Sequence, residues 1–119
     1  MASQNDNGFR SFIASPAISA FLVVDVLADG SISPAAGGVT QGIGVLQQDC
    51  AAGGYGQVKL FTAPGTFMVQ STVLVTAGNN YSIATGGYAS TVTATTWPLA
   101  LQALSSGAVS STIEFAGKL

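Results

Sequence analysis

Apolar and polar residues alternate along short stretches of this chain, and turn-forming residues separate the stretches. From residue 13 onward Val, Ile, Thr and Tyr are abundant, and Gly, Asn, Asp or Pro recur at the spacing of about 8 to 12 residues that is typical of all-β proteins. No helix-sized window repeats its apolar residues about every 3.6 positions, as an amphipathic helix would. The pattern predicts an all-β fold, in which residues 13–119 form a single compact domain of β-barrel or sandwich type.

One hairpin pattern occurs twice in the sequence. The stretch SAFLVVDVLADGSIS (19–33) aligns with TAGNNYSIATGGYAS (76–90), so that Gly30 falls on Gly87. Each copy reads as a strand, a glycine turn and a second short strand, and Asp-Gly and Gly-Gly are typical of tight hairpin turns. The sequence therefore predicts an internal repeat.

The similarity continues beyond the hairpin if the second copy is shortened by two residues. Residues 42–61 then align with 97–116, and Val58 falls on Ile113. Strand alternation would point Val58 into the core and Lys59 into water. A unit of about 45 residues can hardly close a core alone, whereas two units can cover one another. The expected repeats are about 18–61 and 75–116, joined by a connector at 62–74.

Four residues stand out from the strand pattern as candidate contact residues. Residues 1–12 are polar and rich in Asn, which predicts an extended N-terminal arm, but Phe9 and Phe12 flank Arg10 within it. These two aromatic residues either fasten the arm to the domain's own core or anchor a neighbouring molecule. Trp97 is either a core or edge aromatic residue or a subunit contact, since Trp suits both settings.

The composition narrows the range of partners. Charged residues make up 7% of the chain against a usual value of about 25%, and the net charge is −2. A surface of this kind does not suit nucleic acid, but it suits packing against other protein, because few ions have to be desolvated. The longest apolar run, 20–27, contains Asp25 and is far too short to span a membrane. A single cysteine and a polar N-terminus without signal-peptide features fit synthesis in a reducing cytoplasm.

The residue types needed for catalysis or metal binding do not gather in the sequence. There is no histidine, and the carboxylates are scattered apart from Asp25 and Asp29, of which Asp29 belongs to the Asp-Gly turn. Cys50 lacks a histidine partner and is expected to be a small buried or loop residue. The glycine-rich stretch 51–56 precedes a strand pattern, not a helix, and lacks the Lys-Ser/Thr of a phosphate loop. No catalytic residue, cofactor or metal site is therefore expected, and the protein is not expected to be an enzyme.

Several turn and strand motifs resemble those of small bacteriophage capsid cement proteins, which are also called head decoration proteins. The matching segments are ADG (28–30), SPAAG (33–37), GIGV (42–45), AAGG (51–54) and VKLF (58–61). The segment VLVTAGNNYSIATGGYAS (73–90) is similar to a second element of that family, with Asn79-Asn80 where the family often has an acidic residue.

The resemblance implies a structural virion protein that sits on the outside of the head and cements neighbouring subunits of the major capsid protein. It implies a homotrimer, made and assembled in the cytoplasm of the bacterial host, that stabilises the expanded shell. By this analogy Phe9, Arg10 and Phe12 are the candidate capsid contacts. The alternative is a fibre-tip or receptor-binding module of a phage particle. In that case exposed aromatic residues would bind a glycan, and the candidates are Tyr55, Tyr81, Tyr88 and Trp97.

Overall fold

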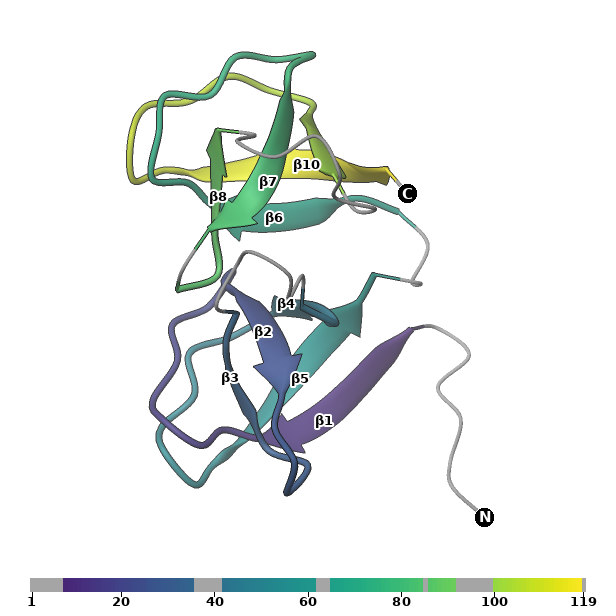
Figure 1. The fold of residues 1–119 in the computed structure, drawn as a ribbon, viewed down its shortest axis with the longest axis vertical. Helices are drawn as coiled ribbons and strands as arrows, with labels where there is room; N and C mark the ends of the chain where they lie inside the picture. The colour runs from purple at the N-terminus through teal and green to yellow at the C-terminus, as the bar shows by residue number, and fades with distance from the viewer. Residues whose placement is uncertain (1–7, 36–41, 62–64, 85, 92–99, 119) are drawn as a thin grey trace.

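The computed structural model describes residues 8–35, 42–61, 65–84, 86–91 and 100–118 (Figure 1). These residues form ten strands: β1 (Phe9–Ile13), β2 (Val23–Val26), β3 (Ile32–Pro34), β4 (Gly44–Leu46), β5 (Tyr55–Leu60), β6 (Phe67–Gln70), β7 (Asn80–Ala84), β8 (Tyr88–Thr91), β9 (Ala100–Ala103) and β10 (Thr112–Lys118). In this part of the chain no helix occurs that is long and apolar enough to cross a membrane. The predicted all-β fold is confirmed.

The strands form two five-stranded antiparallel sheets packed in a sandwich-like arrangement. The first sheet has the order β1-β5-β4-β2-β3 and the second has the order β6-β10-β9-β7-β8. Counted within its own half of the chain, each sheet therefore has the order first, fifth, fourth, second, third. The two sheets lie one beyond the other along the long axis of a molecule measuring 40 × 27 × 24 Å (Figure 1).

Strand pairing in the first sheet recurs in the second at a constant offset. The pair Gly44–Leu60 recurs as Leu101–Gly117, with each partner 57 positions further along the chain. The bridge between Ile18 and Cys50 recurs in the same way as the bridge between Val75 and Gly107. We call residues 8–61 the first repeat and residues 65–118 the second repeat.

This constant offset corrects the predicted alignment of the second half of each repeat. Val58 corresponds to Phe115, not to Ile113, and the shortening by two residues does not occur. A slip of two residues leaves every side chain on the same face of its strand, so the alternation pattern cannot reveal it.

Each repeat begins one strand earlier than the sequence predicts. β6 lies inside residues 62–74, which were expected to be a connector. Its counterpart β1 begins at Phe9, inside residues 1–12, which were expected to be an arm. β1 pairs with β5 from the Phe9–Lys59 pair to the Ile13–Tyr55 pair. Aromatic and β-branched residues favour strands, which explains why this segment joins the sheet. The remaining part of the expected arm, residues 1–7, lies outside the described residues.

The two hairpin turns are formed as predicted. Gly30 donates its N–H to the Leu27 carbonyl at 2.9 Å, and Gly87 donates to the Ala84 carbonyl at 3.0 Å. Both glycines have positive φ, at 88° and 84°, which is the left-handed region where a side chain is strained. The duplicated glycine is therefore a requirement of the backbone at both turns.

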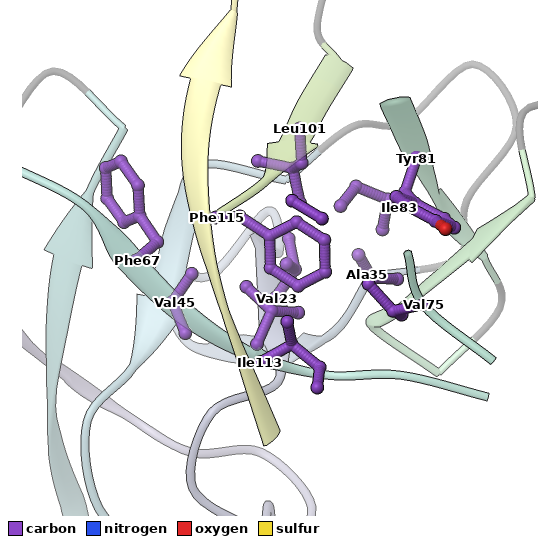
Figure 2. Close-up of a cluster of buried hydrophobic side chains, with 13 residues drawn as sticks. Val23, Ala35, Val45, Phe67, Val75, Tyr81, Ile83, Leu101, Ile113 and Phe115 are labelled. Carbon is purple, nitrogen blue, oxygen red and sulfur yellow. The ribbon is translucent and has the colours of Figure 1, made fainter. Parts of the chain in front are cut away.

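Two clusters of buried side chains hold the sheets together. One lies within the first repeat and includes Ile18, Leu46 and Val58. The other fills the second repeat around Phe115, and Val23, Ala35 and Val45 reach into it from the first repeat (Figure 2). The second cluster therefore forms both the core of one repeat and the junction between the two.

At one pair of neighbouring positions in the core, the larger and the smaller side chain are interchanged between the two repeats. The first repeat has Cys50 beside Gly56, where a β-carbon on Gly56 would lie 3.3 Å from the Cys50 β-carbon. The second repeat has Gly107 beside Ile113, and a β-carbon on Gly107 would overlap the Ile113 Cδ1 at 1.9 Å. The shared space is filled by the Cys50 side chain in the first repeat and by the Ile113 side chain in the second, and the facing position is glycine in each case. This arrangement preserves close packing in both repeats.

Candidate functional site

The candidate contact residues of the N-terminal segment lie on both faces of β1, an edge strand of the first sheet. Phe12 is half-buried against the first-repeat core, and the guanidinium carbon of exposed Arg10 lies 5.1 Å from the centroid of its ring. Phe9 points to the other face, where the Lys59 ammonium lies 5.9 Å from its ring centroid. Phe12 thus fastens the strand to its own domain, while Arg10 remains accessible to another molecule.

A shallow groove of about 520 Å³ opens beside this strand. Its lining includes Arg10 and Phe12 of β1 together with Ile13, Val26 and Tyr55. The last three are large apolar or aromatic side chains exposed to 40%, 42% and 70%. We call the surface formed by Phe12, Ile13, Val26, Ile43 and Tyr55 the end face, because it closes the free end of the first repeat.

Sequence reasoning missed most of the end face. Val26 and Ile43 are ordinary strand-type residues in the sequence, and no local pattern separates them from buried neighbours, while Tyr55 was considered only for the glycan-binding alternative. Only the pairing of β1 with β5 and the curl of the sheet bring Ile13 next to them. A parallel bridge between Ala14 and Ile32 produces this curl, because it joins the chain just after β1 to β3 at the opposite edge.

Lys59 lies at the junction of the repeats and does not point freely into water as predicted. Its half-buried ammonium group donates to the Thr66 carbonyl at 2.6 Å and lies 4.9 Å from the centroid of the Phe67 ring. The Thr66 hydroxyl in turn donates to a Glu114 carboxylate oxygen at 2.5 Å. The Lys59 ammonium therefore connects the first repeat to Thr66 of the second repeat, and Glu114 holds Thr66 in place.

The Asp49-Cys50 segment has a structural role. Asp49 Oδ1 accepts the Ala20 N–H at 2.8 Å, and at the corresponding place in the second repeat the Ser106 hydroxyl oxygen accepts the Ala77 N–H at 2.9 Å. Cys50 is buried, with its Sγ 3.3 Å from the Gly54 carbonyl oxygen. The recurrence of the side-chain bond 57 residues later indicates a loop clasp. Across the described ranges, no group of three or more His, Cys, Asp or Glu residues could hold a metal ion.

Asp29 is held in its charged form by the turn that contains it. Its Oδ1 accepts the Ser31 hydroxyl at 2.6 Å and the Ser31 N–H at 2.9 Å. These hydrogen bonds, the hydroxyl first, lower the pKa of Asp29 below its ordinary value of 3.8. The carboxylate therefore stabilises the hairpin tip at the edge of the end face.

The aromatic residues proposed for a glycan site do not lie on one surface. Tyr81 is buried, and its hydroxyl oxygen accepts the Thr76 N–H at 2.9 Å. Tyr88 is half-buried against the first-repeat core, and Tyr55 is exposed on the end face. Trp97, the candidate subunit contact, lies outside the described residues. The described tyrosines thus do not form the aromatic platform that the receptor-binding alternative needs.

Comparison with known proteins reveals a similarity of fold. No protein-family model matches the sequence, and no curated protein matches it. Among solved structures, the chain is similar to the head fiber gp8.5 N base of bacteriophage phi29, with a TM-score of 0.74 and 16% sequence identity. The match covers 92% of this chain and 92% of that chain. Over nearly its whole length, this protein has a fold similar to that of the N base of a phage head fiber.

Proposed function

We propose that this protein is a structural component of a phage particle, attached to the outside of the head. The observation that carries the proposal is the similarity of fold to a head fiber base across 92% of both chains. Because one fold can serve many functions, a second line of support is needed. It comes from the turn and strand motifs that resemble head decoration proteins, and from the charged fraction of the chain, which at 7% suits packing against protein.

In its finer form, the proposal is that the protein cements neighbouring subunits of the major capsid protein. Three weak contacts made at once by a homotrimer would add up to tight binding, since the second and third contacts are intramolecular. Arg10 supports this role, because it is exposed on an edge strand beside an apolar groove. The role requires no catalysis and no cofactor.

The first test is binding to heads. Purified protein is sedimented with expanded heads that lack it, and the position of the bound protein is then determined by electron microscopy. Saturable binding to the outer surface is expected, and an excess of unlabelled protein should compete for it. If folded protein stays in the supernatant at every concentration, attachment to that head is refuted.

A second measurement separates a cement from the base of an appendage. A cement protein should raise the temperature at which filled heads release their DNA, because it holds neighbouring subunits together. The base of an appendage should bind equally well and leave that temperature unchanged. Binding to host cells or glycans by the isolated protein would instead favour the receptor-binding alternative.

A further inference from the structure

The two repeats are stacked head to tail. The turn between β7 and β8 rests on β2, where the Val23 N–H donates to the Gly87 carbonyl at 2.9 Å. The matching turn between β2 and β3, which carries Gly30, points away at the free end of the first repeat (Figure 1). The hairpin turns of the two repeats thus point the same way along the long axis (Figure 1).

As a result, the face of the second repeat that is covered at the junction corresponds to the face of the first repeat that is exposed. Ile83 is 3% exposed in the core at the junction, whereas its counterpart Val26 is 42% exposed on the end face. The corresponding pairs are Phe67 and Arg10, Val69 and Phe12, Gln70 and Ile13, Ile83 and Val26, and Gly87 and Gly30. The molecule therefore contains a covered version and an uncovered version of one interface.

The opposite end of the stack has the reverse character. The first repeat uses Val23 and Val45 to cover the second repeat. The counterparts of these two residues are Asn80 and Gln102, which are polar, and Gln102 Nε2 donates to the Gly78 carbonyl at 3.1 Å. Repeat arrays commonly end in polar faces of this kind, which stop further stacking. A second copy adding head to tail would place Asn80 and Gln102 on the apolar end face, which is a poor fit.

The internal junction shows what kind of partner the end face fits. At the junction, the turn at residues 20–21 and the start of β2 supply both side chains and backbone: the carbonyl of Phe21, whose φ is 64°, accepts the Gln70 N–H at 2.9 Å, and Val23 bonds to Gly87 as described. On the end face the matching backbone groups belong to Ile13 and Gly30, both exposed. The fitting partner is a short turn that leads into a strand and carries aromatic and β-branched side chains.

We propose that the end face docks such a turn segment of the head's coat protein, in the place that residues 20–23 take at the internal junction. This inference rests on the proposed attachment to a head. Docking would combine backbone hydrogen bonds with the burial of apolar side chains. Arg10 stands where the second repeat has Phe67, so an acidic side chain of the docked segment would fit beside this position.

The test compares two pairs of substitutions in the full-length protein. The first combines Val26→Lys with Tyr55→Lys, which places two charges on the end face at exposed positions. The matched control combines Leu74→Lys with Leu104→Lys, two exposed leucines of the second repeat that lie outside the end face. Circular dichroism and thermal unfolding establish that both variants are folded before binding to heads is measured by co-sedimentation.

The end-face variant should bind heads at least tenfold more weakly than the wild type, whereas the control variant should bind as the wild type does. Equal binding by both variants would overturn the docking inference and leave head attachment intact. Failure of the wild type itself to bind would refute the attachment, and the inference with it. Sedimentation velocity adds a separate result: if the end-face variant alone dissociates an oligomer that the wild type forms, the face joins copies of this chain and the coat-protein inference is wrong.

Discussion

Replacing Gly87 by alanine is the sharpest test of how the repeats are joined, because the chain supplies its own control. Gly87 and Gly30 occupy the same place in their hairpins, with φ of 84° and 88°. A β-carbon on Gly30 would meet no atom within 4 Å, whereas one on Gly87 would lie 2.2 Å from the Val23 carbonyl oxygen and 2.9 Å from the Val23 nitrogen. The two substitutions therefore share a backbone cost and differ in the contact between repeats.

The expected magnitudes follow from these contacts. A left-handed backbone destabilises a residue that has a β-carbon by about 1–2 kcal/mol. Alanine also lowers the entropy of the unfolded chain relative to glycine, which offsets part of this loss, so Gly30→Ala should lower the free energy of unfolding by about 1 kcal/mol. Gly87→Ala adds overpacking of about 1–3 kcal/mol and weakens the hydrogen bond from Val23, worth roughly 1 kcal/mol. Its total of about 3–5 kcal/mol is a large part of the ~5–15 kcal/mol that stabilises a typical domain.

The assay is equilibrium unfolding in urea, followed by far-ultraviolet circular dichroism, together with thermal unfolding. Gly30→Ala should lower the midpoint slightly, and Gly87→Ala should lower it several times more. Equal losses for the two variants would refute the reasoning, because they would mean that the contact of Gly87 with Val23 adds nothing to stability.

Three further outcomes are expected. Ser110 has a φ of 67°, so Ser110→Gly should raise the free energy of unfolding by up to ~1 kcal/mol; a lower urea midpoint would contradict this reasoning. Gly107→Ala and Ile113→Val should together cost at least ~1 kcal/mol less than the sum of the single changes, because the second removes the Cδ1 that a β-carbon would overlap; strict additivity in urea unfolding would show that the two sites do not compete for space. The depressed pKa of Asp29 contributes stability above the ordinary value of 3.8, and this contribution is lost as pH falls through the folded-state pKa. Ser31→Ala should therefore raise that pKa in a carboxyl-carbon NMR titration, and an unchanged midpoint would exclude the hydroxyl as its main cause.

The sequence was sufficient to predict the fold class and the hairpin repeat, because both hairpin turns take a positive φ, which favours glycine. For this reason the correspondence between Gly30 and Gly87 can be recognised in the sequence. The alignment of the second half of one repeat with that of the other could not be predicted. Aligning Val58 with Ile113 or with Phe115 leaves the alternation of apolar and polar residues unchanged. β1 was predicted as an arm because its surroundings are polar and its pairing partner, β5, lies more than forty residues away.

The candidate site was less accessible to sequence reasoning. Arg10 and Phe12 were identified because they stand out in a polar stretch, and the structure places both beside the groove. Whether they contact a capsid remains a prediction. Val26 and Ile13 were missed because an exposed apolar residue and a buried one look alike in a strand pattern, and Tyr55 was named only for the glycan-binding alternative. Their exposure depends on which end of the stack is covered, and that is a property of the whole molecule.

The exchanged volumes at Cys50–Gly56 and Gly107–Ile113 bear on the inheritance of the gene. Tandem repeats in a gene can undergo unequal recombination, which adds or removes a whole repeat. A crossover between these two positions would create a unit with either Cys and Ile or two glycines at the paired sites. The first product is overfilled and the second contains a void, and each defect costs on the order of 1–3 kcal/mol. The difference between the two cores therefore disfavours a change in the number of repeats, because genes produced by misaligned recombination would encode less stable proteins.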